Sequence, residues 1–131
     1  MKIDHLGIAV KSLDERLAFW RDGLGLAVSG VEEIASERVK VAFLEVGQSR
    51  IELLEPTDPD SVVARFMARR GEGLHHVCIA VPDLAVALAR LKAQGARLID
   101  EVPRVGAGGS RVAFVHPEAA GGVLIELKEK P

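Results

Sequence analysis

Two histidines and two glutamates stand where charged or polar side chains are unusual. His5 and His76 each lie in a short run of β-forming apolar residues, and Glu52 and Glu126 each lie between two bulky apolar neighbours. A buried carboxylate is costly unless a positive charge or a metal ion compensates it. Imidazole nitrogens and carboxylate oxygens are ligands for cobalt, manganese, zinc, nickel and iron(II). The four residues therefore indicate a site for one divalent metal ion, without selecting which metal.

Each of these residues taken alone has a more ordinary interpretation. A single histidine on a strand is usually a core or surface residue, and a single glutamate in an apolar strand can mark the edge of a sheet. No Lys or Arg is expected at an equivalent inward position, so the pattern predicts no side-chain cation beside the carboxylates. What favours the metal site is that both residue types recur at matching positions of an internal repeat.

The sequence contains the same unit twice. A shift of 71 residues places residues 4–10 (DHLGIAV) on residues 75–81 (HHVCIAV), and residues 40–44 (KVAFL) on residues 111–115 (RVAFV). Three inserted residues then bring 51–53 (IEL) onto 125–127 (IEL). The two histidines are thus equivalent to each other, and so are the two glutamates.

Both halves predict the same order of elements, a strand, a helix and three further strands. In the first half, Ser12 opens a helix through a capping box with Glu15; in the second, Asp83 is the expected N-cap. The predicted strands are 3–10, 26–35, 38–46 and 49–55, then 74–81, 97–101, 111–116 and 122–128. We predict an α+β fold in which paired βαβββ modules form one cup-shaped mixed-sheet domain over 1–131. It comprises module 1 (1–56), a linker helix (57–72) and module 2 (73–131).

Side-chain alternation predicts a cavity beside each histidine. On the first strand His5 shares a face with Gly7 and Ala9, and on the fifth His76 shares a face with Cys78 and Ala80. The large residues point the other way, toward the helices. Small side chains beside a polar one leave space for a ligand.

Composition narrows the class of protein. The chain has 131 residues, a formal net charge of −2 and one cysteine. The charge gives no reason to expect a nucleic acid or an anionic membrane as partner. No apolar run approaches the ~18 residues of a membrane span, and the N-terminus lacks the apolar stretch of a signal peptide. Together with the unpaired Cys78, these features favour a cytoplasmic protein.

With these residues in hand, the chain resembles the vicinal-oxygen-chelate superfamily (glyoxalase/bleomycin resistance/dioxygenase), and within it the methylmalonyl-CoA epimerases. The resemblance covers almost the whole chain. It is carried by residues 4–10, 51–56 (IELLEP), 73–77 (GLHHV) and above all 106–127 (GAGGSRVAFVHPEAAGGVLIEL). It implies a glyoxalase-like fold, a homodimer and an acyl-CoA substrate. His5, Glu52, His76 and Glu126 match the family's metal ligands, and Glu126 matches the residue that moves the proton.

The resemblance also implies a reaction, the interconversion of (2R)- and (2S)-methylmalonyl-CoA by 1,1-proton transfer through an enolate. Glu126 would be the general base on one face. Val41 stands where some epimerases carry a second carboxylate. Glu45 shares its face and Lys40 is adjacent, but neither is a clean match. Glu52, the repeat partner of Glu126, is the simplest candidate for the second proton carrier.

Two other functions remain open. Glyoxalase I (lactoylglutathione lyase) uses a similar ligand quartet, but its usual Asp-Pro-Asp-Gly turn is replaced here by His116-Pro117 and the residues after them. A non-enzymatic binding protein of the superfamily would generally lack the four ligands. An extradiol dioxygenase fits less well, because it uses two His and only one Glu.

Weaker features have ordinary explanations. His75 should point away from His76, and Cys78 should be a small packing residue. The glycine-rich stretch 106–109 is either a rim over the substrate or a connecting loop. The arginines of the linker should form an exposed helix face; they are Arg65, Arg69 and Arg70.

Overall fold

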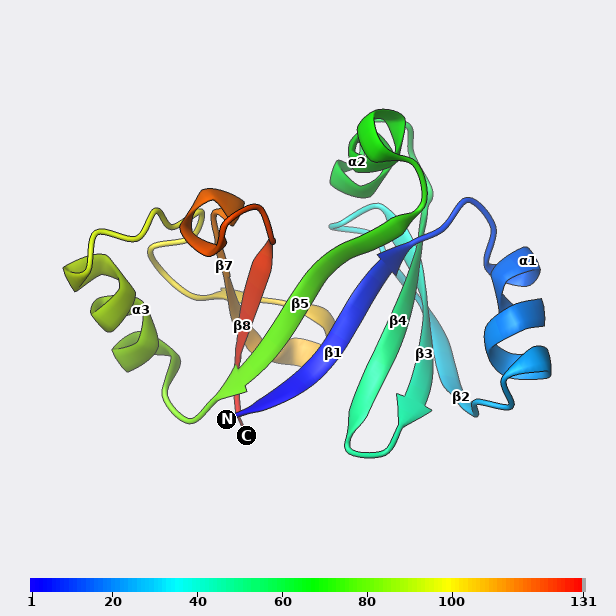
Figure 1. Cartoon of the computed structure of the whole chain (residues 1–131), viewed down its shortest axis with the longest axis horizontal. Helices are drawn as coiled ribbons and strands as arrows, with labels where there is room; N and C mark the ends of the chain where they lie inside the picture. Colours follow the sequence, from blue (N-terminus) through cyan, green and yellow to red (C-terminus); the bar gives the residue numbers. More distant parts are fainter. Residues whose placement is uncertain (131) are drawn as a thin grey trace. The chain divides into compact units, whose positions relative to one another are not determined.

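The computed structural model describes residues 1–130, and its contacts divide the chain into two units (Figure 1). The N-terminal unit comprises residues 5–75, and the C-terminal unit comprises residues 1–4 together with the described residues from His76 onward. Within residues 1–130, no helix is long and apolar enough to cross a membrane.

The N-terminal unit contains a mixed sheet in the order β2-β3-β4-β1. Its strands are β1 (Lys2–Ala9), of which residues 5–9 lie in this unit, β2 (Val28–Ile34), β3 (Val39–Val46) and β4 (Ser49–Pro56). β1 and β4 are parallel, whereas β2, β3 and β4 are joined by antiparallel pairing. A parallel pair needs a long connection, and here the helical segment after β1 and the β2–β3 hairpin supply it.

The C-terminal unit repeats this pattern in the order β5-β8-β7-β6. Its strands are β5 (Gly73–Val81), of which residues 76–81 lie in this unit, β6 (Arg104–Val105), β7 (Arg111–Val115) and β8 (Ile125–Glu129). β5 is parallel to β8, and β7 pairs antiparallel with both β8 and β6. The predicted α+β class and the repeated strand-helix-strand order are therefore confirmed.

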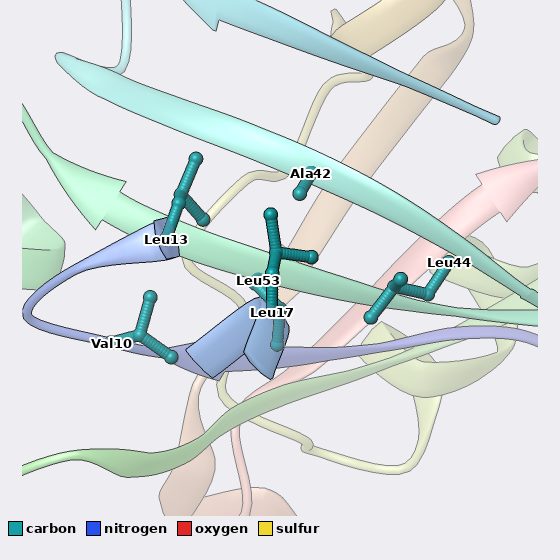
Figure 2. Close-up of a cluster of buried hydrophobic side chains, with 6 residues drawn as sticks. All are labelled: Val10, Leu13, Leu17, Ala42, Leu44 and Leu53. Atoms are coloured by element: carbon teal, nitrogen blue, oxygen red, sulfur yellow. The ribbon is translucent and has the colours of Figure 1, made fainter. Parts of the chain in front are cut away.

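The first helical segment begins as predicted but changes character. Helix α1 (Leu13–Leu17) is capped by Ser12, whose Oγ accepts a hydrogen bond from the Glu15 N–H at 3.3 Å. It continues as the π-helix η1 (Ala18–Gly23) rather than as an α-helix. The apolar face of this segment covers one face of the N-terminal sheet (Figure 2). The buried residues of this cluster are Val10, Leu13, Leu17, Ala42, Leu44 and Leu53.

Helix α2 (Val62–Arg70) covers part of the opposite face of the same sheet. Ser61 caps it through a hydrogen bond from the Ala64 N–H, and Gly71 ends it with a φ of 75°. The buried side chains of this second cluster are Ala9, Val39, Val41, Leu54 and Val63. The three arginines of the helix are exposed, as predicted.

Helix α3 (Leu84–Ala93) has the predicted N-cap, since the Asp83 side chain accepts a hydrogen bond from the Val86 N–H at 3.1 Å. It packs against the C-terminal sheet, on the face opposite Glu126. The buried side chains of this cluster are Val81, Leu84, Leu88, Ala113, Val115 and Leu127.

The predicted strand at 97–101 is wrong. This segment makes one isolated bridge, between Leu98 and Val115, and the paired strand lies later, at β6. The Asp100 carboxylate accepts the Phe114 N–H at 2.8 Å, in place of a backbone carbonyl. A side chain that takes a ladder hydrogen bond competes with strand formation.

Glu72, just after α2, ties the end of that helix to the start of α1. Its Oε1 accepts hydrogen bonds from the Lys11 N–H at 2.8 Å and from Arg16 Nε at 3.1 Å, and its Oε2 lies 2.7 Å from Arg16 Nη2. The hydrogen bonds from Arg16, followed by that from Lys11, lower the pKa of Glu72 from about 4.5 to about 2.

We expect Glu72→Gln to destabilise the fold at neutral pH and not at low pH. A lowered carboxyl pKa contributes stability that is complete above the unfolded pKa and is lost as pH falls through the folded one. The difference in urea midpoint between wild type and variant should therefore shrink from about pH 5 down to pH 2. Glu32→Gln, at an exposed position on β2, is the control. A constant difference across this range would contradict the assignment.

Candidate functional site

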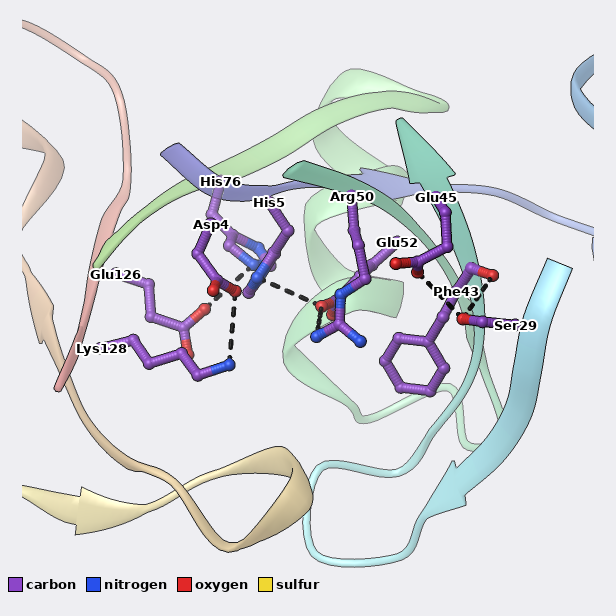
Figure 3. Close-up of polar contacts among 10 residues, drawn as sticks. All are labelled: Asp4, His5, Ser29, Phe43, Glu45, Arg50, Glu52, His76, Glu126 and Lys128. Atoms are coloured by element: carbon purple, nitrogen blue, oxygen red, sulfur yellow. Dashed lines mark hydrogen bonds and ion pairs between the residues drawn. The ribbon is translucent and has the colours of Figure 1, made fainter. Parts of the chain in front are cut away.

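In the N-terminal unit, a histidine and a glutamate meet on the face that α1 does not cover. The parallel register of β1 and β4 sets Gly7 beside Glu52. His5 precedes Gly7 by two residues, so strand alternation places its imidazole on the same face as Glu52. His5 Nδ1 lies 3.1 Å from Glu52 Oε2, and both residues are only 6% exposed (Figure 3).

The C-terminal unit builds the same pair from β5 and β8. Here Cys78 takes the place of Gly7, since it stands beside Glu126 in the parallel register. His76 Nε2 lies 3.3 Å from Glu126 Oε1, with 6% of His76 and 9% of Glu126 exposed. Cys78 is fully buried, consistent with the predicted packing role. Each unit therefore brings one predicted histidine together with one predicted glutamate.

The repetition extends to an aromatic ring beside each carboxylate. Phe43 on β3 is paired with Glu52, and Phe114 on β7 is paired with Glu126. An arginine lies over each ring. The guanidinium carbon is 4.9 Å from the ring centre for Arg50 over Phe43, and 5.1 Å for Arg104 over Phe114. Cation–π contact of this kind fixes the position of a guanidinium.

The expectation that no Lys or Arg occupies an inward position is wrong. Arg50 precedes Glu52 by two residues, so strand alternation places both side chains on one face, and Nη2 lies 3.5 Å from Glu52 Oε2. In the C-terminal unit, Lys128 follows Glu126 by two residues and its Nζ lies 3.4 Å from Asp4 Oδ2. Strand alternation places residues two apart on one face. Applied to Arg50 and Lys128, it would have placed both cations beside the glutamates from the sequence alone.

The donor sets fit a divalent cation. In each unit a buried imidazole nitrogen and a buried carboxylate oxygen approach within 3.1–3.3 Å. Nitrogen and oxygen donors of this mix bind the borderline first-row metals. A cation would also compensate the charge of carboxylates held away from water.

The glyoxalase/bleomycin resistance protein/dioxygenase superfamily model matches residues 4–114. The chain belongs to this superfamily. Among the relatives, the ethylmalonyl-CoA/methylmalonyl-CoA epimerase of Cereibacter sphaeroides is 35% identical over 130 residues, covering 98% of this chain and 97% of that protein. An uncharacterised protein of Bacillus subtilis is 41% identical over 128 residues, covering 98% of this chain and 91% of its own length.

Solved structures support the same relationship and the glyoxalase-like fold. A variant of the Streptomyces coelicolor methylmalonyl-CoA epimerase, in complex with 2-nitronate-propionyl-CoA, is 37% identical and matches with a TM-score of 0.93. That match covers 99% of this chain and 94% of the other. The chain is therefore similar, over nearly its whole length, to proteins named as epimerases of acyl-CoA thioesters.

The remaining sequence candidates of this superfamily member lie outside the two His–Glu pairs. His75 packs edge-on against Phe66, with ring centres 4.9 Å apart. Val41, which has no titratable group, is fully buried in the apolar cluster beneath α2. Glu45 is exposed and accepts a hydrogen bond from Ser29 Oγ at 3.0 Å. His116 caps the 3₁₀ turn η3 (Pro117–Ala120), which agrees with the predicted turn.

Residues 106–110 form a tight loop before β7. The short 3₁₀ turn η2 (Ala107–Gly109) lies within it, and the Gly106 N–H donates to the Ser110 carbonyl at 2.7 Å. A side chain at Gly106 would meet Val112 Cγ2 at 2.8 Å. The close approach of the loop to β7 therefore favours glycine at this position, because any larger residue would force Val112 or the loop to shift.

Proposed function

We propose that this protein is a methylmalonyl-CoA epimerase, which interconverts (2R)- and (2S)-methylmalonyl-CoA. The observation that carries the proposal is the buried His–Glu pair, present once in each unit of a chain related to such epimerases over nearly its whole length. In this proposal the two modules and the helix between them act as one domain.

The four residues His5, Glu52, His76 and Glu126 would together hold one divalent metal ion. Cobalt, manganese, zinc, nickel and iron(II) all suit these donors. When bound, the ion would supply a Lewis acid that stabilises negative charge on the thioester and carboxylate oxygens of the substrate.

Glu126 is the proposed general base. It is placed on β8 between the buried Cys78 and the ring of Phe114, which limits access of water to its carboxylate. It removes the proton from the carbon between the thioester and the free carboxylate, leaving an enolate. A positioned carboxylate contributes about 100- to 10,000-fold to such a step.

Glu52 is the proposed second proton carrier. Inversion needs a proton on the face opposite the one that lost it, and Glu52 is the repeat equivalent of Glu126. Val41 supplies no proton. The two carboxylates would exchange roles when the reaction runs in the other direction.

Metal removal and reconstitution test this function. Treatment with a chelator should abolish inversion of (2R)-methylmalonyl-CoA, and one or more of the five metal ions should restore it. Deuterium uptake from D₂O at the α-carbon should be restored in parallel. Turnover of only the glutathione hemithioacetal would instead identify a lactoylglutathione lyase. Absence of metal binding and of turnover would indicate a binding protein.

The substrate class and the assembly belong to the same proposal. An acyl-CoA is the substrate, and the protein is a cytoplasmic homodimer. Sedimentation equilibrium at several concentrations measures the assembly, and a monomer throughout would exclude the dimer. Cell fractionation measures the location.

A further inference from the structure

Arg50 is held beside a carboxylate without being fully engaged by it. Its side chain is 32% exposed, and the contact between Nη2 and Glu52 Oε2 is 3.5 Å. Charge-assisted hydrogen bonds of this type are typically about 2.8 Å. Glu52 makes its shorter contact, 3.1 Å, with His5. The guanidinium is therefore fixed by its stacking on Phe43 rather than by a close ion pair.

Arg104 in the C-terminal unit provides a comparison, because the carboxylate beside it belongs to a different kind of residue. It stacks on Phe114 in the same way, but its Nε lies 3.3 Å from Asp100. Asp100 is in turn fixed by accepting the Phe114 N–H at 2.8 Å. Asp100 is a structural carboxylate, whereas the carboxylate beside Arg50 is a proposed metal ligand.

Charge balance indicates what completes the surroundings of Arg50. Two glutamates and a divalent ion together are neutral, and the guanidinium then adds one positive charge beside Glu52. A methylmalonyl group carries one negative charge, on its free carboxylate. Electrostatic complementarity favours binding of that anion over a neutral acyl group of similar size.

Building on the proposed function, we propose that Arg50 binds the free carboxylate of the substrate and selects carboxylated acyl-CoA thioesters over neutral ones. Stacking on Phe43 leaves the guanidinium edge available, and its N–H groups match the two oxygens of a carboxylate. A carboxylate accepts several hydrogen bonds, so it can contact Arg50 and another cation together.

This selection is tested by measuring the binding of two thioesters, one with the free carboxylate and one without it. Malonyl-CoA carries the carboxylate, and propionyl-CoA is methylmalonyl-CoA without it. Isothermal titration into metal-loaded wild type, Arg50→Gln, Arg50→Lys and Arg104→Gln gives the affinities. Arg50→Gln should weaken malonyl-CoA binding by about 10- to 100-fold, as expected for loss of a charged hydrogen bond. Its propionyl-CoA affinity should stay within about twofold, since that ligand has no carboxylate.

The two other variants sharpen the result. Arg50→Lys keeps the charge but loses the two-pronged geometry, so it should recover only part of the preference. Arg104→Gln removes an equivalent stacked arginine and should leave the ratio of the two affinities unchanged. In parallel, Arg50→Gln should raise KM for methylmalonyl-CoA more than it lowers kcat, with the metal content unchanged.

Equal weakening of both thioesters would overturn the inference, since Arg50 would then contact the CoA moiety or support the site generally. Loss of metal affinity in Arg50→Gln, large enough to explain the weaker binding, would also overturn it. A wild type that binds both thioesters but does not epimerise methylmalonyl-CoA would instead contradict the proposed function.

Discussion

Glu126→Gln is expected to lower α-proton exchange by about 100- to 10,000-fold, the usual contribution of a positioned general base. The amide has nearly the same shape as the carboxylate but cannot accept a proton from carbon. Binding of the substrate should survive at saturating metal concentration, because the amide keeps an oxygen that can ligate the proposed ion. Exchange is measured as deuterium uptake from D₂O by mass spectrometry, and affinity by titration with malonyl-CoA.

The assay must separate the loss of the base from the loss of the metal. The variant is therefore measured at saturating metal concentration, with its metal content determined on the same sample. Glu118→Gln is the matched control, since this glutamate lies in the same unit with its side chain 70% exposed and pairs with Arg97. Near-normal exchange in metal-loaded Glu126→Gln would remove Glu126 from the role of base.

His76→Ala should cause the second large effect, a fall in metal affinity of at least about 100-fold. Loss of an outer partner of a metal ligand already costs roughly 10- to 100-fold, and loss of a ligand should cost more. Wild type should also melt at a higher temperature as metal is added, because binding to the native state alone stabilises it. His76→Ala should show little of this shift. Elemental analysis and calorimetry measure the two effects.

His75→Ala is the control for the neighbouring position. Strand alternation puts its imidazole on the face opposite that of His76, and it packs against Phe66, so metal affinity should match that of wild type. Equal metal binding by wild type and His76→Ala would exclude His76 as a ligand. Equal losses in both variants would instead point to general damage to β5.

The internal repeat explains why so much of the site could be predicted. One glutamate between two apolar residues has several ordinary explanations. The same pattern at Glu52 and Glu126, at equivalent positions of the repeat, makes a shared functional role the better explanation. The period-two rule then placed each carboxylate and each histidine on the face away from the helix. In the structure, the histidine and the glutamate of each unit lie 3.1 and 3.3 Å apart, whereas their binding of one ion stays a prediction.

The features that the sequence did not predict depend on contacts between residues that lie far apart in the sequence. A strand was predicted at residues 97–101, but the Asp100 carboxylate accepts the hydrogen bond from the Phe114 N–H that a strand partner would accept. Local propensity also does not predict the change from α-helix to π-helix after Leu17. Strand alternation could have predicted that Arg50 shares a face with Glu52. Its stacking on Phe43 could not be predicted, because it depends on the β3–β4 register.

The parallel pairing of the first and last strands in each unit also has a consequence for biosynthesis. His5 and Glu52 are 47 positions apart, and His76 and Glu126 are 50 apart. Contacts of such long sequence separation form late, after the intervening hairpin has closed. Neither pair can exist on a short emerging segment of chain. In the proposed metalloenzyme, acquisition of metal would therefore report a finished fold, and a truncated or misassembled polypeptide would leave the ion in solution.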